Sequence, residues 1–139
     1  VRIKSILAKY EASRKDGKED AGERSDEDAK LKTETQFDSD TLQNAPILPP
    51  QNDNEAALAL ILSRFSTVVR QAGEEYAPNK LCAYIYELCN AFNRFYHATK
   101  ILSQEDERVL GGYISLLRLT KGVLECCIDI LGFAAPEHM

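Results

Sequence analysis

Hydrophobic residues recur at helical spacing between Pro78 and Lys100, the segment around which the rest of the chain is organised. One stripe advances three or four residues at a time, as one face of an α-helix does. This stripe consists of Leu81, Ile85, Leu88, Phe92 and Phe95. A shoulder beside it mixes rings with hydrogen-bonding groups, and consists of Cys82, Tyr86, Cys89, Asn93, Tyr96 and His97. The spacing predicts a helix that buries the stripe and leaves the role of the shoulder open.

The most extended apolar pattern lies near the end of the chain. Residues 103–106, with the sequence SQED, have the form of a capping box, so we expect a helix to start there. Its stripe consists of Leu110, Tyr113, Leu117, Thr120, Leu124, Cys127 and Leu131, widened by Val109, Leu116, Val123 and Ile130. Gly132 is expected to end this helix. Gly111 and Gly112 lower its helix propensity, which is tolerable if they let another helix come close.

Three shorter segments complete the expected helices. Residues 1–12 place Ile3, Ile6, Leu7 and Tyr10 on one face. Asp53 or Asn54 can cap a helix that buries Leu58, Ile61, Leu62 and Phe65, and Ser66 can cap another that carries Val68, Val69 and Ala72. Pro78 suits the first turn of the next helix. No strand pattern competes, so the predicted fold class is all-α, an antiparallel bundle of four or five helices.

A charged stretch interrupts this pattern after the first helix. From Ser13 to Asn44 the chain is dense in Lys, Arg, Asp and Glu and poor in apolar residues, which is typical of a disordered linker. Ile47 and Leu48, which lie between prolines, are expected to pack against the bundle and return the chain to it. The predicted organisation is the end of a connecting helix over 1–12, a flexible insertion over 13–52 and a helical bundle over 53–139. Because the chain begins at Val1 in mid-pattern, we expect a piece of a longer polypeptide.

Net charge argues against a protein that binds nucleic acid through a broadly basic surface. The formal charge is −5 over 139 residues. Neither part is basic, since residues 1–52 carry 9 basic and 11 acidic side chains and residues 53–139 carry 8 and 11. Contact with nucleic acid therefore has to be local and specific, and DNA is not an expected partner.

Four cysteines, at 82, 89, 126 and 127, form no CxxC pair. We interpret them as small buried hydrophobes in a reducing compartment. No apolar run is long enough to span a membrane, and no signal peptide precedes the first helix. The sequence therefore predicts a cytoplasmic protein without a membrane partner.

Patterns for catalysis or metal binding are weak. Cys82, Cys89 and His97 share a helix shoulder but lie seven and eight residues apart, which is poor spacing for a metal site. Cys89 and His97 would be separated by about 12 Å of helical rise, so they cannot form a nucleophilic pair within this helix. No glycine-rich loop opens a helix to cradle phosphate. We expect no catalytic residue, metal or cofactor in this chain.

The shoulder supports three interpretations. Its polar and aromatic members, Tyr86, Asn93, Tyr96 and His97, suit stacking on unpaired bases and hydrogen bonding to them, as in readers of single-stranded RNA. They equally suit packing against neighbouring helices with their polar tips at the rim. A third possibility is a protein-interaction module whose shoulder packs on another protein. Periodicity does not decide among these.

Three separated pieces of the sequence resemble the C-terminal anticodon-binding domain of arginyl-tRNA synthetases, the helical DALR domain. The first piece is RIKSIL at 2–7, and the second contains YEL at 86–88 and AFNRFYH at 91–97. The third is LGFAAPEHM at 131–139, where the family ends in a leucine-glycine turn, a proline and a methionine. The resemblance covers residues 1–12 and about 54–139.

The resemblance implies a parent enzyme that joins arginine to its tRNA with ATP and Mg²⁺. The catalytic domain that performs this chemistry in cis is absent from the chain, which lacks the HIGH-type motif. The expected partner is the anticodon loop of the arginine tRNA isoacceptors. A DALR domain from another tRNA-binding protein is the alternative within the same family.

The resemblance also implies a binding site. Arg2, Tyr96 and Met139 correspond to the basic, aromatic and terminal residues with which the family holds the anticodon loop. Lys100 stands where some members carry a second ring, so either a phosphate contact replaces that stack or the loop aligns differently. Asn93, from the shoulder, completes the expected site. Tyr96 is then the RNA-facing ring of the helix, and Cys82, Cys89 and Tyr86 are expected to pack. The charged insertion looks longer than is usual in the family and has no functional account.

Overall fold

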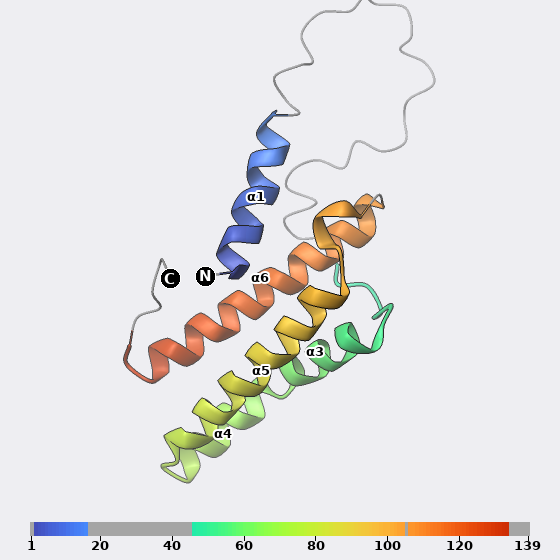
Figure 1. Ribbon diagram of the computed structural model, residues 1–139. Coiled ribbons are helices and arrows are strands. Elements are labelled where there is room, and N and C mark those ends of the chain that lie inside the picture. The colour runs from blue at the N-terminus through green and yellow to red at the C-terminus, as the bar shows by residue number, and fades with distance from the viewer. Residues whose placement is uncertain (1, 17–45, 105, 134–139) are drawn as a thin grey trace, which may run out of the picture.

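The computed structural model describes residues 2–104 except 17–45, and residues 106–133 (Figure 1). Helix α1 spans Arg2–Asp16, α3 Asp53–Ser63, α4 Phe65–Glu74, α5 Pro78–Ala98 and α6 Glu107–Ile130, and a short 3₁₀-helix, η1, spans Ile101–Ser103. In these ranges all regular structure is helical, which confirms the all-α fold class. The part of the charged insertion between 17 and 45 lies outside the described residues, whereas helix α1 continues past residue 12 to Asp16.

The long helices α5 and α6 run antiparallel, with α3 and α4 along one side of α5 and α1 beside α6 (Figure 1). The core between them includes nine side chains that are almost completely shielded from solvent. These are Phe95, Leu58, Leu81, Leu88, Ile114, Leu116, Leu117, Thr120 and Cys127. Much of the wide stripe predicted for the last helix is buried between neighbours, because α6 contacts α1, α3 and α5. Leu110, Leu124 and Leu131 are only partly buried, and Ile130, expected in the stripe, is exposed.

Helix α5 buries a face slightly different from the predicted stripe. Leu81, Leu88, Phe92 and Phe95 are buried as expected, but Ile85 is only partly buried. Tyr84 and Ala91 take part in the core instead. The Tyr84 hydroxyl donates a hydrogen bond of 3.1 Å to the carbonyl of Ile61 on α3, so its polar tip is satisfied inside the protein. The ring of Tyr84 also packs near Phe65 of α4, with a centroid separation of 6.1 Å.

The helix starts differ from the predicted caps. Asn52, rather than Asp53 or Asn54, caps α3, and its side chain accepts a hydrogen bond of 2.9 Å from the Glu55 amide. Helix α4 follows at Phe65 without a side-chain cap, so Ser66 lies inside it. Helix α6 is capped by Asp106, whereas Ser103, the predicted cap, belongs to η1. The C-terminal prediction is confirmed, since Gly132 follows α6 with a φ of 79°, which favours glycine.

Glu55 is buried although it carries an ionisable group. One of its carboxylate oxygens accepts a hydrogen bond of 2.9 Å from the Gln51 amide, just before the cap. Together with the Asn52–Glu55 bond this forms a reciprocal arrangement that satisfies two amides at the start of α3. The buried carboxylate is therefore part of the helix end and has a structural explanation.

The segment after the insertion returns to the bundle at Leu48, which packs against the core as predicted. A β-carbon built on Gly112 of α6 would lie 3.6 Å from atoms of Leu48 and Pro46. The glycine in α6 therefore accommodates an extended segment rather than the helix that the sequence suggested. Ile47, between them in the chain, is exposed.

The predicted burial of all four cysteines and the predicted packing of Tyr86 were wrong. Only Cys127 is buried; Cys89 is half-buried, and Cys82 and Cys126 are exposed free thiols. Tyr86 is 74% exposed, so it does not pack in the core. The physical reason is that the buried face of α5 includes Tyr84 and Ala91 and so lies further from the shoulder than predicted. Cys82 and Tyr86 therefore point toward solvent.

Candidate functional site

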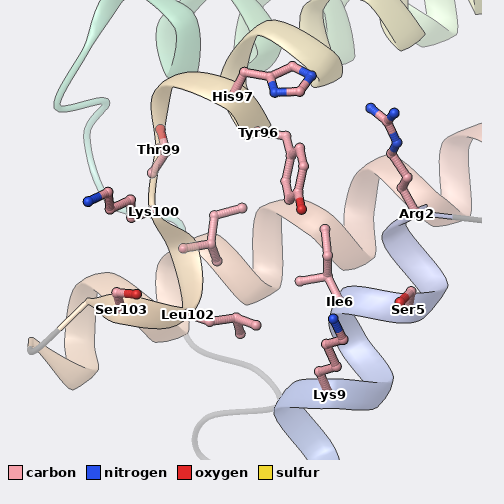
Figure 2. A pocket seen from close by; sticks show the side chains of 11 residues that line it. Arg2, Ser5, Ile6, Lys9, Tyr96, His97, Thr99, Lys100, Leu102 and Ser103 are labelled. Atoms are coloured by element: carbon pink, nitrogen blue, oxygen red, sulfur yellow. The ribbon is translucent and has the colours of Figure 1, made fainter.

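A cleft of about 530 Å³ lies between α1 and the turn that connects α5 to α6 (Figure 2). One wall is α1, which contributes Arg2, Ser5, Ile6 and Lys9. The opposite wall is the end of α5 with the following turn and η1, which contribute Tyr96, His97, Thr99, Lys100, Ile101, Leu102 and Ser103. Residues more than ninety positions apart in sequence therefore face each other across this cleft.

The α1 wall follows from the amphipathic pattern of its sequence. Ile3, Ile6, Leu7 and Tyr10 are buried against the bundle. Arg2, Ser5 and Lys9 are three and four residues apart, so they fall on one adjoining edge of the same helix. Ile6 lies between these two faces, is buried and lines the cleft. The packing that fixes α1 thus also places Arg2 and Lys9 at the cleft.

The opposite wall is fixed by a buried residue just beyond α5. After Ala98, Thr99 adopts an extended conformation, and its amide donates a hydrogen bond of 3.0 Å to the Phe95 carbonyl. Ile101 is then buried in the core and anchors η1. Leu102, next in the chain, remains exposed. The helix ends at this point because burial of Ile101 requires the chain to change direction.

The ring of Tyr96 is positioned by neighbouring rings and remains accessible from the cleft. Its centroid lies 6.1 Å from that of Phe92, with an interplanar angle of 21°, and 5.5 Å from that of His97 in an edge-to-face arrangement. Phe92 is buried, so it supports Tyr96 from the core side. Tyr96 nevertheless keeps 37% of its surface exposed, and its hydroxyl points toward Ile6 (Figure 2). A ring with these properties can stack on a ligand without first being ordered.

Arg2 links the two walls next to this ring. Its Nη1 donates to the Asn93 side-chain oxygen at 3.4 Å, which connects α1 to α5 one turn before Tyr96. The bond is exposed, so its net contribution to stability is at most about 1 kcal/mol. Its main effect is on position, because it keeps the guanidinium beside Tyr96 (Figure 2). Asn93 is half-buried and lies next to the cleft rather than in its lining.

The cleft is locally basic although the chain as a whole is acidic. Arg2, Lys9 and Lys100 line it together with His97, and none of its lining residues is Asp or Glu. The Lys100 side chain extends away from α1, toward the outer edge (Figure 2). Charges of one sign lining a hollow concentrate their potential there, so the site favours an anionic ligand.

The structure therefore brings most of the predicted site residues together. Arg2, Tyr96 and Lys100 line one cleft, and Asn93 is bonded to Arg2. Met139 lies outside the described residues. Tyr86 is two to three helical turns from Tyr96 and does not line the cleft, so the shoulder does not act as one surface.

Lys9 was not among the predicted site residues. The available signal was its spacing, since Lys9 follows Arg2 by seven residues and so lies on the same edge of a helix.

Other chemistry has little support in the described ranges. Residues 2–16, 46–104 and 106–133 contain no group of three or more His, Cys, Asp or Glu side chains placed to hold a metal ion. The helices described there also include none that is long and apolar enough to cross a membrane. Burial raises the pKa of the Cys127 thiol to about 11, which makes this buried cysteine a poor nucleophile.

Comparison with known proteins shows which family the chain belongs to. The chain matches the DALR anticodon binding domain over residues 1–139 and belongs to that family. It is 50% identical over its whole length to an arginine–tRNA ligase of Agathobacter rectalis, and 46% identical over 90 residues, 65% of the chain, to that of Alkaliphilus oremlandii. The arginine–tRNA ligase of Haemophilus influenzae is 38% identical over 105 residues, 76% of the chain.

The chain spans 19%, 15% and 18% of the length of these three ligases, so it corresponds to one part of such an enzyme. The family predicted from the three separated sequence pieces is thereby confirmed.

Proposed function

We propose that this chain binds the anticodon loop of arginine tRNA as the C-terminal domain of an arginine–tRNA ligase. The observation that carries the proposal is the basic cleft, in which the accessible ring of Tyr96 stands beside Arg2. Single-stranded loops of RNA are read by rings that stack on unpaired bases and by groups that contact the backbone. Membership of the anticodon-binding family supports the anticodon loop as the particular ligand.

Each site residue has a proposed role. Tyr96, supported by Phe92 on one side, stacks on a base with its free face, an interaction worth about 1 to 3 kcal/mol. Arg2 contacts the nucleotide next to that base, and Asn93 holds the guanidinium in place. Lys100, at the outer edge, contacts a phosphate. Met139 is proposed as a further contact on the resemblance alone.

The proposed parent enzyme supplies the remaining chemistry. A catalytic domain in the same polypeptide would use ATP and Mg²⁺ to activate arginine and transfer it to the tRNA. The anticodon-binding domain would contribute binding and orientation of the tRNA. The proposed location is the cytoplasm, where tRNA is charged, with neither DNA nor a membrane as a partner.

The test compares two RNA hairpins with the same stem. The full-length protein is titrated with a hairpin that carries an arginine anticodon loop and with one whose loop is scrambled, and binding is followed by fluorescence anisotropy. We expect the arginine loop to bind at least about tenfold more tightly, which corresponds to about 1.4 kcal/mol. Equal dissociation constants would overturn anticodon recognition.

The same assay separates the alternatives. Preference for the anticodon loop of another tRNA would indicate a DALR domain from a different tRNA-binding protein. Failure to bind any hairpin or any tRNA would favour a protein-interaction module.

A further inference from the structure

We propose that Lys9 holds a backbone phosphate of the RNA segment whose base stacks on Tyr96, which makes it an additional affinity-determining residue. The inference rests on the proposed function, because it assumes RNA in the cleft. Lys9 was not predicted as a contact from the sequence, and its assignment comes from its position on α1.

Lys9 and Arg2 line the cleft from the same edge of α1. Lys9 lies seven residues after Arg2, so the two side chains are separated by about 10 Å of helical rise. Both line the cleft, and Ile6 forms the apolar surface between them. Arg2 stands beside the Tyr96 ring, whereas the Lys9 amine is directed along α1 toward Ile6, below the Tyr96 hydroxyl (Figure 2). The cleft therefore presents one cation beside the ring and a second beyond its hydroxyl.

No carboxylate is placed to compete for the Lys9 ammonium among the described residues that line the cleft. Four basic side chains elsewhere in the bundle are paired with acidic ones: Arg64 with Glu87, Lys80 with Glu75, Arg118 with Glu11 and Lys121 with Glu125. Among the residues that the structure describes, Lys9 has no such pair, and no acidic residue lines the cleft. Its charge is therefore available to a ligand.

The chemistry of a single-stranded loop suits two separate cations on this wall. Such a loop carries one phosphate per nucleotide, so a base stacked on Tyr96 has a phosphate on each side of it. One cation beside the ring and a second beyond its hydroxyl can meet two successive phosphates. Lys9 is exposed and carries a compact, flexible ammonium, which binds a phosphate as a point charge and reads no base. Lys9 should therefore add affinity without adding sequence preference.

The experiment measures the salt dependence of RNA binding by the full-length protein. Lys9→Gln is compared with the unmutated protein and with Lys4→Gln. Lys4→Gln removes the same charge from the same helix, at a residue that does not line the cleft. Removal of one phosphate contact should lower the slope of log K against log salt by about 0.7, the value for single strands. We expect this change, with severalfold weaker binding at low salt, for Lys9→Gln only. Lys9→Arg, which keeps the charge, should retain the parental slope.

Three outcomes distinguish this inference from the proposed function. A parental slope for Lys9→Gln would overturn the phosphate contact, even if the arginine loop is still preferred over the scrambled one. An equal loss of slope in Lys4→Gln would also overturn it, because the effect would then be a general one of charge. If the unmutated protein binds the arginine loop and the scrambled loop equally well, the proposed function is contradicted instead. Lys9 is exposed and Lys4 half-buried, and matching thermal midpoints for the variants show that folding is unchanged.

Discussion

Three tyrosines on helix α5 illustrate how differently similar residues are used. Tyr84 is buried and donates to the Ile61 carbonyl, Tyr86 is exposed to solvent, and Tyr96 is supported by Phe92 at the edge of a cleft. Periodicity assigns each of them only an angle around the helix. Their roles depend on which helix packs at that angle and on whether a carbonyl lies within reach of the hydroxyl. Family resemblance predicted Tyr96 as a site residue, whereas the sequence pattern did not predict the burial of Tyr84.

Tyr84 should make folding sensitive to alkaline pH. Burial raises its pKa from 10.0 to about 12, because the phenolate is disfavoured away from water. Between these values the unfolded chain loses the proton first, so the stabilisation is complete below pH 10 and is lost as pH rises toward 12. We expect Tyr84→Phe to weaken the decline of the free energy of unfolding between pH 10 and 12, measured by urea titration.

Cys127, whose pKa burial raises to about 11, stays in both proteins, so each of them keeps part of the alkaline decline. The charge of Cys127 is also one cause of the raised pKa of Tyr84, so the two contributions are coupled. At neutral pH, Tyr84→Phe should cost about 1 kcal/mol for the lost hydrogen bond. Identical pH dependence in the two proteins would contradict the assignment of Tyr84.

At the scale of elements, the apolar stripes predicted which segments are helical, and the helix ends were less predictable. Several residues able to cap lie close together at each start, such as Asn52 and Asp53 before α3, or Ser103 and Asp106 before α6. The choice depends on tertiary packing. Residues 101–103 form η1 with Ile101 buried, so α6 begins only at Glu107, with Asp106 as its cap. Local sequence does not contain that information.

The start of α6 can be tested directly. The Asp106 side chain accepts hydrogen bonds from the amides of Arg108 at 2.8 Å and Val109 at 3.4 Å. Replacement by alanine removes this cap, so we expect Asp106→Ala to reduce the free energy of unfolding by about 1 kcal/mol. Chemical denaturation followed by circular dichroism provides the measurement.

Ser103→Ala is the matched variant, because the sequence pattern suggested Ser103 as the cap. Its stability should stay within about 0.5 kcal/mol of the parent. A larger loss for Ser103→Ala than for Asp106→Ala would show that the helix begins where the sequence pattern placed it.

At the scale of the molecule, the cleft exists because α1, packed on α6, lies opposite the C-terminal end of α5. Arg2 and Tyr96 are distant in sequence, and no periodicity connects them. Resemblance to a family identified both residues, whereas the basic lining of the cleft, with Lys9 and without carboxylates, became visible only in the fold. An overall charge of −5 therefore does not describe the surface that meets a ligand.

The most direct test of anticodon recognition compares two tyrosines of α5 in the full-length protein. Tyr96→Ala should weaken binding of arginine tRNA by about 1 to 3 kcal/mol, roughly fivefold to 150-fold in dissociation constant, because one base stack is lost. Tyr86→Ala removes an exposed ring from the same helix outside the cleft and should leave the dissociation constant unchanged. Equal affinities for Tyr96→Ala and the parent would contradict the account.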